Sequence, residues 1–213
     1  PKIAEFAASR LYKSEAREEK IKPNIANTLR KALEIYLIYT AAGIVLFILA
    51  GLPIFDAINL TFTSISTGGM SIKNANVGFY QNSLVYIITM ALMILGATSF
   101  SIHYKIVKTR GKSVLKDVQF QLLICLIAIA SAFILVTNKR VPIEELFTIV
   151  SAITTTGANV VPPYELARWG SASLIVLMVL MLIGGSSGST GGGLKLIRVI
   201  TVIKGMNLTI TNL

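Results

Sequence analysis

The sequence predicts an all-α membrane protein made of two tandem copies of one unit: a helix, a short helix, a polar loop and a second helix. Three observations lead to this prediction. The 213 residues are 54% apolar and only 14% charged, whereas soluble domains usually contain about 25% charged residues. Several apolar runs are 20 residues long, which as helices would match the thickness of a bilayer. The pattern of the first half also recurs in the second half at a spacing of 88 residues.

The long helices are expected at residues 32–51, 83–102 and 118–137, where the apolar runs contain no more than one charged residue. A fourth run, 171–183, has only 13 residues before a stretch rich in glycine. That run is too short to cross a membrane alone.

Two shorter segments, 53–72 and 142–161, lie between the long runs. Each begins at a proline, which suits the first turn of a helix, and an acid follows closely (Asp56 and Glu144), near the positive end of the helix dipole. About three apolar turns come next, a poor length for crossing a bilayer and a good one for a re-entrant helix. We therefore expect two short helices that enter the membrane without crossing it.

The internal repeat aligns the polar loops that follow these short helices. Thr67 falls on Thr155 and Gly69 on Gly157 when the chain is shifted by 88 residues. Parallel repeats place both loops on one side of the membrane. The Lys and Arg residues cluster in 1–31, 105–116 and 195–204, on the other side, as cytoplasmic loops do. Few aromatics accompany these clusters, which excludes a nucleic-acid surface.

The two polar loops have a composition that suits a lining of main-chain carbonyls. Irregular backbone is tolerated at membrane depth only where it lines a cavity or is buried in protein, and rings of carbonyls can replace the hydration shell of a cation. Gly69 and Gly157 would supply backbone angles that other residues resist. Two turns at the membrane surface are the alternative, and the recurrence at one spacing argues against it.

Residues 184–193 are all glycine, serine or threonine, so they are not expected to continue the preceding helix. A nucleotide-binding loop is excluded because Lys195 is separated from the glycines by Leu194 and no Ser or Thr follows it. We expect no enzyme activity. Cys125 is the only cysteine, which leaves no disulfide or zinc site, and it is expected to be a small buried hydrophobe.

The motifs "FDAINLTFTSISTGGMSI", "VSAITTTGA" and "IGGSSGSTGGGLKLIR" resemble the TrkH/KtrB/HKT superfamily of potassium transport proteins. The resemblance implies a potassium-channel-like fold of four repeats around one pore, with K+ as the transported ion and no covalent cofactor. It places 1–31 as a cytoplasmic connector, 32–116 as the second pore repeat, 117–204 as the third and 205–213 as the start of the next segment. Two repeats cannot close a fourfold pore. Either the first and fourth repeats lie upstream and downstream in a longer chain, which we expect, or two copies of this chain would have to assemble.

The resemblance also implies which residues act. The K+-binding carbonyls of the filter would belong to Thr67, Gly68, Gly69, Thr155, Thr156 and Gly157. An intramembrane gating loop would consist of Gly184, Gly185, Ser186, Ser187, Gly188, Ser189, Thr190, Gly191, Gly192 and Gly193, with Lys195 at its inner mouth. Lys195 either opposes cations there or extends out of the membrane toward water, and the sequence leaves both open.

The function implied is potassium uptake across the plasma membrane of a prokaryotic cell, by a multi-pass, pore-forming subunit of a Trk/Ktr-type system. Its partners would be a second copy of itself and a cytoplasmic nucleotide-binding regulatory subunit that is TrkA-like or KtrA-like. The alternative is a non-transporting membrane anchor or assembly subunit whose glycines serve helix packing. That alternative does not explain ten consecutive small residues. The sequence leaves open whether transport is passive or coupled to another ion.

The counterpart of the glycine stretch in the first unit, around 96–105, contains far less glycine. We therefore expect a break in only one of the two equivalent helices. Ser99 and Ser101 either bond back to their own helix or mark a weaker break. His103 is the only histidine and is expected at the membrane interface, not as a ligand.

Overall fold

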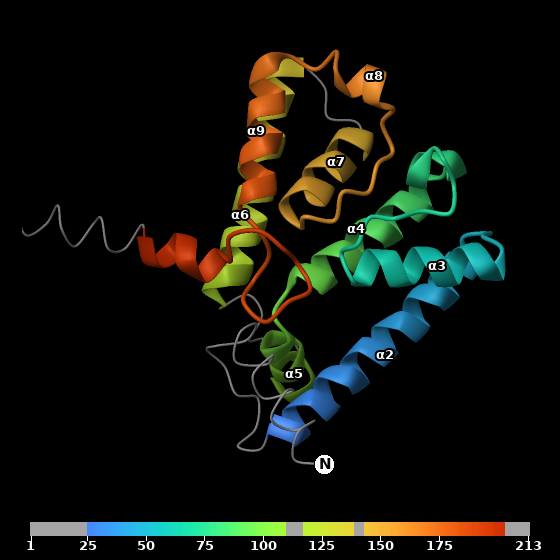
Figure 1. The fold of residues 1–213 in the computed structure, drawn as a ribbon, viewed down its shortest axis with the longest axis vertical. Coiled ribbons are helices and arrows are strands. Elements are labelled where there is room, and N and C mark those ends of the chain that lie inside the picture. Colours follow the sequence, from blue (N-terminus) through green and yellow to red (C-terminus); the bar gives the residue numbers. More distant parts are fainter. Residues whose placement is uncertain (1–24, 110–116, 139–142, 203–213) are drawn as a thin grey trace, which may run out of the picture.

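The computed structural model describes residues 25–109, 117–138 and 143–202. The regular elements in these ranges are helical, apart from one isolated bridge between Ile183 and Leu194, and the predicted all-α class is confirmed (Figure 1). The elements are α2 (Ile25–Leu49), α3 (Ile54–Ile65), η1 (Asn76–Tyr80), α4 (Ser83–Ala97), α5 (Phe100–Thr109), α6 (Val118–Asn138), α7 (Ile143–Ile153), α8 (Pro163–Leu166) and α9 (Ser171–Leu182). Residues 196–202 are again helical.

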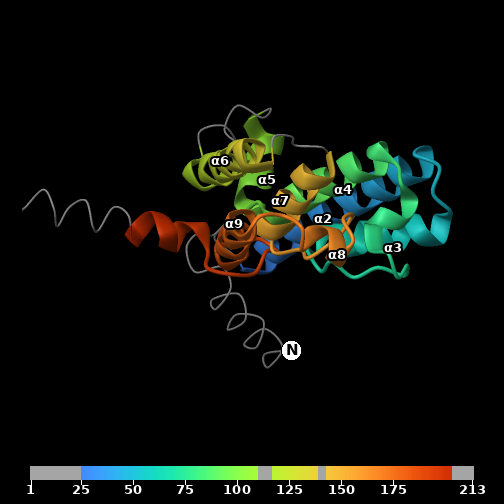
Figure 2. The ribbon, with the colours of Figure 1, turned by 90° about the horizontal axis from the view of Figure 1, so that it is seen from above.

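The helices form two units with the same internal packing. In the first unit α2, α3 and α4 pack against one another, and in the second α6, α7 and α9 do the same. A contact between α4 and α7 joins the units. Figures 1 and 2 show the two short helices, α3 and α7, lying on either side of α4, with α6 and α9 side by side in the second unit. The short helices begin directly after Pro53 and Pro142, as the sequence predicts.

Each unit has its own apolar core. Phe47, Leu60 and Met93 lie in the first cluster, and Leu123 and Ile153 lie in the second. Phe147 of α7 belongs to the first cluster, where its ring meets that of Tyr86 edge to face with centroids 5.9 Å apart. Since full burial of one such side chain stabilises a fold by about 1.5–3 kcal/mol, this shared cluster fixes how the two units sit together.

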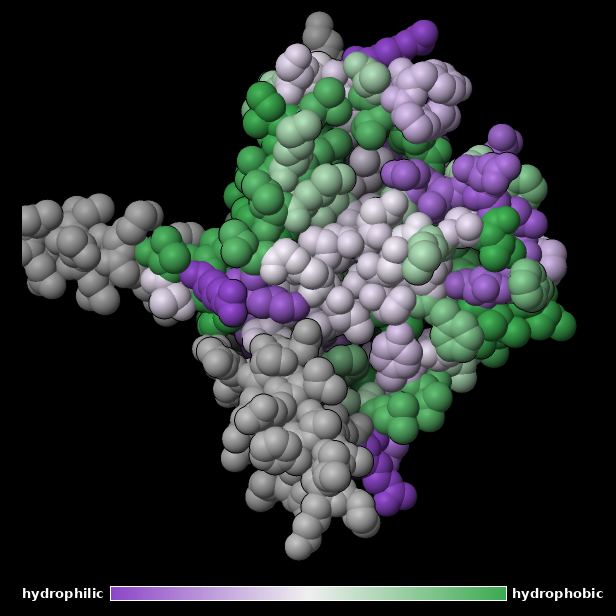
Figure 3. All heavy atoms as spheres, viewed as in Figure 1, coloured by the Kyte–Doolittle hydropathy of each residue, from purple (hydrophilic) through white to green (hydrophobic). Residues whose placement is uncertain are grey.

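The outward surfaces of the long helices are apolar and exposed. Side chains such as Leu46, Ile129 and Met178 are 47–63% exposed, and apolar atoms cover α9 in Figure 3. Two helices, α2 and α6, are long and apolar enough to cross a membrane. Cys125 also faces outward from α6, so the prediction that it is buried was wrong. The helix α6 is apolar around its whole circumference, and α7 and α9 cover only part of it.

The second helix of the first unit is broken, although its sequence is a continuous apolar run. The helix α4 ends at Ala97, Thr98 is extended (φ −88°, ψ 143°), and α5 begins at Phe100. The hydroxyl of Ser99 accepts a hydrogen bond from the amide of Ser101 at 3.3 Å, at the start of α5. The expectation of a break in only one of the two equivalent helices was therefore wrong, and Ser99 and Ser101 do mark a break.

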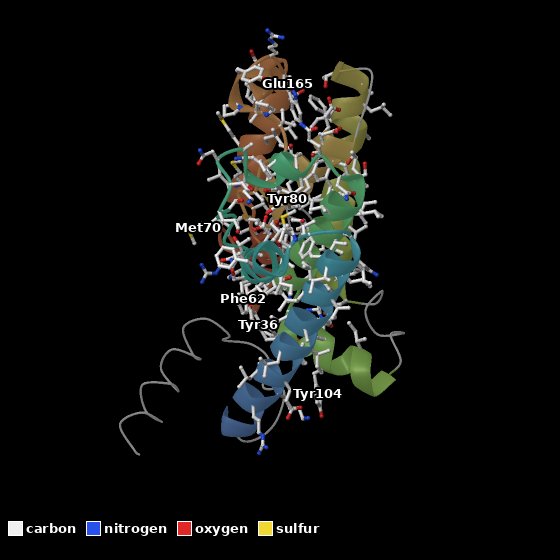
Figure 4. All side chains as sticks on the ribbon, turned by 90° about the vertical axis from the view of Figure 1, so that its right-hand side faces the viewer. Tyr36, Phe62, Met70, Tyr80, Tyr104 and Glu165 are labelled. Atoms are coloured by element: carbon white, nitrogen blue, oxygen red, sulfur yellow. The ribbon has the colours of Figure 1, made fainter. Side chains whose placement is uncertain are left out.

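His103 is buried inside the protein, with 2% of its surface exposed. Its Nδ1 lies 3.0 Å from the hydroxyl of Tyr39, and its Nε2 lies 2.9 Å from the carbonyl oxygen of Leu95. These bonds join α2, α4 and α5 just beyond the break. The helices α5 and α8 lie at opposite ends of the molecule, as Tyr104 and Glu165 mark in Figure 4.

Candidate functional site

Both short helices end in the same hydrogen-bonded turn. The amides of Thr67 and Gly68 donate back into the last turn of α3, and the amides of Thr155 and Thr156 do so in α7, with N···O distances of 2.8–3.2 Å. Paired bonds of this kind form the Schellman motif that ends many helices. We call the segments that contain them turn 66–69 and turn 154–157.

The two turns share an unusual backbone conformation. Thr67 and Thr155 have positive φ angles of 51° and 56°, and Gly69 and Gly157 have angles of 69° and 76°. Glycine usually occupies the left-handed position of the Schellman motif. An L-residue there costs about 1–2 kcal/mol, and a β-branched residue is a true outlier. The same strain at equivalent positions of both units indicates a function, because strained backbone concentrates at functional sites.

The two turns lie against each other. A Cβ atom on Gly69 would lie 1.9 Å from the carbonyl oxygen of Thr156, so only glycine permits this approach. Within the described part of the chain, the main-chain oxygens of Thr67, Gly68, Thr156 and Gly157 accept no hydrogen bond. The structure therefore brings all six residues predicted for the filter into two adjacent turns.

A charged cluster that the sequence did not reveal joins the first turn of α3 to the chain between turn 66–69 and α4. Asp56, which is 6% exposed, accepts a hydrogen bond from the hydroxyl of Tyr80 at 3.0 Å and forms an ion pair with Lys73 at 3.2 Å. Burial, together with the adjacent carboxylate of Asp56, raises the pKa of Tyr80, so the phenol stays protonated and donates. The position of Asp56 in the first turn of α3 was the only sequence signal for this cluster.

A cavity of about 380 Å³ lies beside this cluster. Tyr36, Phe62, Met70 and Tyr80, which are labelled in Figure 4, line it together with Asp56. The side chain of Asn76 donates to the carbonyl oxygen of Gly69 at 3.0 Å. The chain that leaves turn 66–69 is thus fixed by polar side chains before it enters α4.

Residues 184–193 form a closed loop between α9 and the helical turns at 196–202, as expected for a stretch that cannot continue a helix. We call it the glycine loop. At its neck, the amide of Gly184 donates to Leu194 and the amide of Leu194 donates to Leu182, both at 2.9 Å. A Cβ atom on Gly184 would lie 1.6 Å from the carbonyl oxygen of Gly192. Close backbone packing therefore requires glycine here.

The glycine loop bonds to the break between α4 and α5. The amides of Ser186 and Thr190 donate to the carbonyl oxygens of Ala97 and Gly96 at 2.9 and 3.0 Å, and the amide of Phe100 donates back to the loop at 3.0 Å. The break frees carbonyls that a continuous helix would have used, and the loop takes them up. This exchange is the physical reason why the first unit is broken where its sequence shows no glycine stretch.

The glycine loop also contacts both turns. The hydroxyl of Thr67 lies 3.0 Å from the carbonyl oxygen of Thr190, and the hydroxyl of Thr155 accepts from the amide of Gly192 at 2.6 Å. Lys195 turns its ammonium group back onto the carbonyl oxygen of Gly191, so this side chain does not extend away from the loop.

Each of the two units has long membrane-type helices, a short helix, and a strained turn in which some main-chain oxygens accept no hydrogen bond from the described residues. This arrangement is that of a pore-loop membrane protein. Comparison with known protein families shows which family of this class the chain belongs to. A family model described as the TrkH cation transport protein matches residues 4–141 and 131–213. The chain belongs to the TrkH family.

Two curated relatives illustrate the similarity. The chain is 41% identical over 197 residues to an uncharacterized cation transporter of Methanocaldococcus jannaschii, covering 92% of this chain and 40% of that protein. It is 30% identical over 207 residues to the Trk system potassium uptake protein TrkH of Halomonas elongata, covering 91% of this chain and 42% of that one. The chain therefore spans about two fifths of the length of these relatives.

A solved structure agrees with the fold. The crystal structure of the potassium transporter TrkH from Vibrio parahaemolyticus superposes with a TM-score of 0.77 at 29% identity, over 88% of this chain and 42% of that one. The fold of this chain is that of part of a helical membrane potassium transporter.

Proposed function

We propose that this chain provides two pore repeats, 32–116 and 117–204, of a protein that takes up K+ across the plasma membrane of a prokaryotic cell. Residues 1–31 would connect to them from the cytoplasm, and 205–213 would begin the next segment. The relatives named as potassium uptake proteins support the choice of ion. K+ is cargo here, and it requires no covalent chemistry from the chain.

The observation that carries the proposal is the pair of adjacent, strained turns. Main-chain oxygens of Thr67, Gly68, Thr156 and Gly157 accept no hydrogen bond in the described part of the chain, and such carbonyls can replace the hydration shell of a monovalent cation. The C-terminal ends of α3 and α7, which carry partial negative charge, lead directly into the turns. We propose that Gly69 and Thr155 complete the set of coordinating residues.

We further propose that the glycine loop is the gate of this pore. Its contacts with both turns and with the broken helix support this role, because a segment bonded to both turns can obstruct the path between them. The proposed partners are a second copy of the protein and a cytoplasmic nucleotide-binding regulatory subunit similar to TrkA or KtrA. Relatives that are named as Trk system potassium uptake proteins support the regulatory subunit.

Uptake of Rb+, a tracer for K+, tests the proposal. The intact protein, purified and reconstituted into liposomes, is expected to admit Rb+ down its gradient and to prefer it over Na+. Empty liposomes and liposomes with an unrelated helical membrane protein serve as controls. A membrane anchor would give the same Rb+ content as the controls, and that result would refute the proposed function.

A further inference from the structure

The two strained threonines both contact the glycine loop through their hydroxyls, Thr67 as a donor and Thr155 as an acceptor. Each hydroxyl lies 2.7 Å from the carbonyl oxygen of the residue before it. Each also reaches the loop, Thr67 at the carbonyl oxygen of Thr190 and Thr155 at the amide of Gly192. A hydroxyl has one hydrogen and two lone pairs. Thr155 can therefore donate to its neighbour and accept from Gly192 at the same time.

Glycine in place of Thr67 or Thr155 would relieve the strain of the backbone at these positions. Both threonines occupy the left-handed position of a Schellman motif, with φ angles of 51° and 56°, where glycine is the usual residue. Glycine would adopt this conformation without a steric penalty, but it would supply no hydroxyl. The strain is therefore accompanied in both units by a side-chain contact that glycine cannot make.

We infer that the hydroxyls of Thr67 and Thr155 are a latch that holds the glycine loop closed against the two turns. This inference rests on the proposed function, in which the loop is the gate. Both threonines act as positioning residues through their side chains, whatever their carbonyls bind. Movement of the loop away from the turns breaks the latch contacts, so the latch stabilises the closed state and not the open one.

The other contacts of the glycine loop limit how far a change at Thr155 can shift the balance between open and closed protein. The bonds to Ala97 and Gly96 and the bonds at the neck of the loop are made by main-chain atoms, so they survive any side-chain change at Thr155. Replacing Thr155 removes one hydrogen bond from the closed state and leaves these main-chain hydrogen bonds in place. The net free energy that one hydrogen bond contributes corresponds to a change of about fivefold in the ratio of open to closed protein.

The test compares Thr155→Ala with Thr155→Ser in the intact protein, reconstituted into liposomes without its regulatory subunit. Resting Rb+ and Na+ uptake are measured for each, together with the thermal unfolding midpoint. Thr89→Ala is the matched control, because the hydroxyl of Thr89 is buried in α4 and bonds only within its own helix, to Val85 at 2.7 Å.

The latch predicts that Thr155→Ala raises resting Rb+ uptake about fivefold, with no change in the preference for Rb+ over Na+ and a fall in the unfolding midpoint no larger than that of Thr89→Ala. Thr155→Ser keeps the hydroxyl and is expected to raise resting uptake less than Thr155→Ala does. Thr89→Ala is expected to lower the midpoint and leave uptake unchanged, which separates the latch from a general loss of stability.

Three results would overturn the inference. Equal resting uptake in the parent protein and in Thr155→Ala would show that the hydroxyl does not hold the gate. Loss of the preference for Rb+ in Thr155→Ala would show that the hydroxyl maintains the filter and not the gate. Absence of Rb+ uptake in both the parent protein and Thr155→Ala would overturn the proposed function, and the latch with it.

Discussion

The contact between the two turns makes the two filter glycines unequal, and this inequality can be tested with Gly69→Ala and Gly157→Ala. Both glycines have positive φ angles, 69° and 76°, so alanine costs each backbone about 1–2 kcal/mol. Only Gly69 faces a neighbour. Its new Cβ would lie 1.9 Å from the carbonyl oxygen of Thr156, whereas no described atom lies within 4 Å of a Cβ on Gly157.

The expected loss of selectivity in Gly69→Ala follows from the distance between the new Cβ and the carbonyl oxygen of Thr156. Carbon and oxygen atoms do not approach within about 3 Å, so Thr156 must retreat by about 1 Å in Gly69→Ala. Misplacement of this size costs a catalytic group about 100-fold, and we expect the preference for Rb+ over Na+ to fall by at least about tenfold. Gly157→Ala is expected to keep most of that preference.

Paired Rb+ and Na+ uptake into liposomes measures the effect. Gly51→Ala is the matched control, because Gly51 also has a positive φ angle (91°) with no described atom near its Cβ position, and it lies outside both turns. It should reproduce the backbone cost without any change in selectivity. Intact selectivity in Gly69→Ala, or equal losses in Gly69→Ala and Gly157→Ala, would refute the reasoning.

Two further predictions concern the glycine loop and the cluster of Asp56, Lys73 and Tyr80. Gly184→Ala would place a Cβ 1.6 Å from the carbonyl oxygen of Gly192, so the neck of the loop cannot close, and we expect raised resting Rb+ uptake; uptake at the parent level would count against the loop as a gate. Tyr80→Phe removes the hydrogen bond to Asp56 and is expected to lower the free energy of unfolding by about 1.5–3 kcal/mol, measured by chemical denaturation in detergent. The folded pKa of Tyr80 is raised above its ordinary value of 10.0. The stability that the hydrogen bond contributes should therefore be constant below pH 10 and be lost as the pH rises further. A stability difference between the parent protein and Tyr80→Phe that already disappears between pH 7 and pH 9 would contradict this role of the phenol.

Much of the fold could be predicted because the signals are local. The prolines at 53 and 142 predict where α3 and α7 begin, and the apolar runs predict α2 and α6 to within a few residues except at the start of α2. The 88-residue repeat predicts that the two turns are equivalent, and their shared φ angles agree with it. These features depend on neighbours in sequence, so the sequence reveals them.

Other features depend on contacts between distant segments, and the sequence did not reveal them. The break after Ala97 forms because the glycine loop supplies partners for the carbonyls it frees. Left-handed backbone at Thr67 and Thr155 was unexpected because threonine ordinarily avoids it. The ion pair between Asp56 and Lys73 exists because the chain beyond turn 66–69 folds back over α3.

The central claim is that the two turns coordinate a monovalent cation with main-chain oxygens, and anomalous diffraction from crystals of the intact protein grown in Rb+ tests it most directly. The account predicts an anomalous peak bounded by carbonyl oxygens of Thr67, Gly68, Thr156 and Gly157, which Na+ replaces poorly. Rb+ peaks that lie only outside these turns, or crystals in Rb+ with no peak along the axis between them, would contradict it.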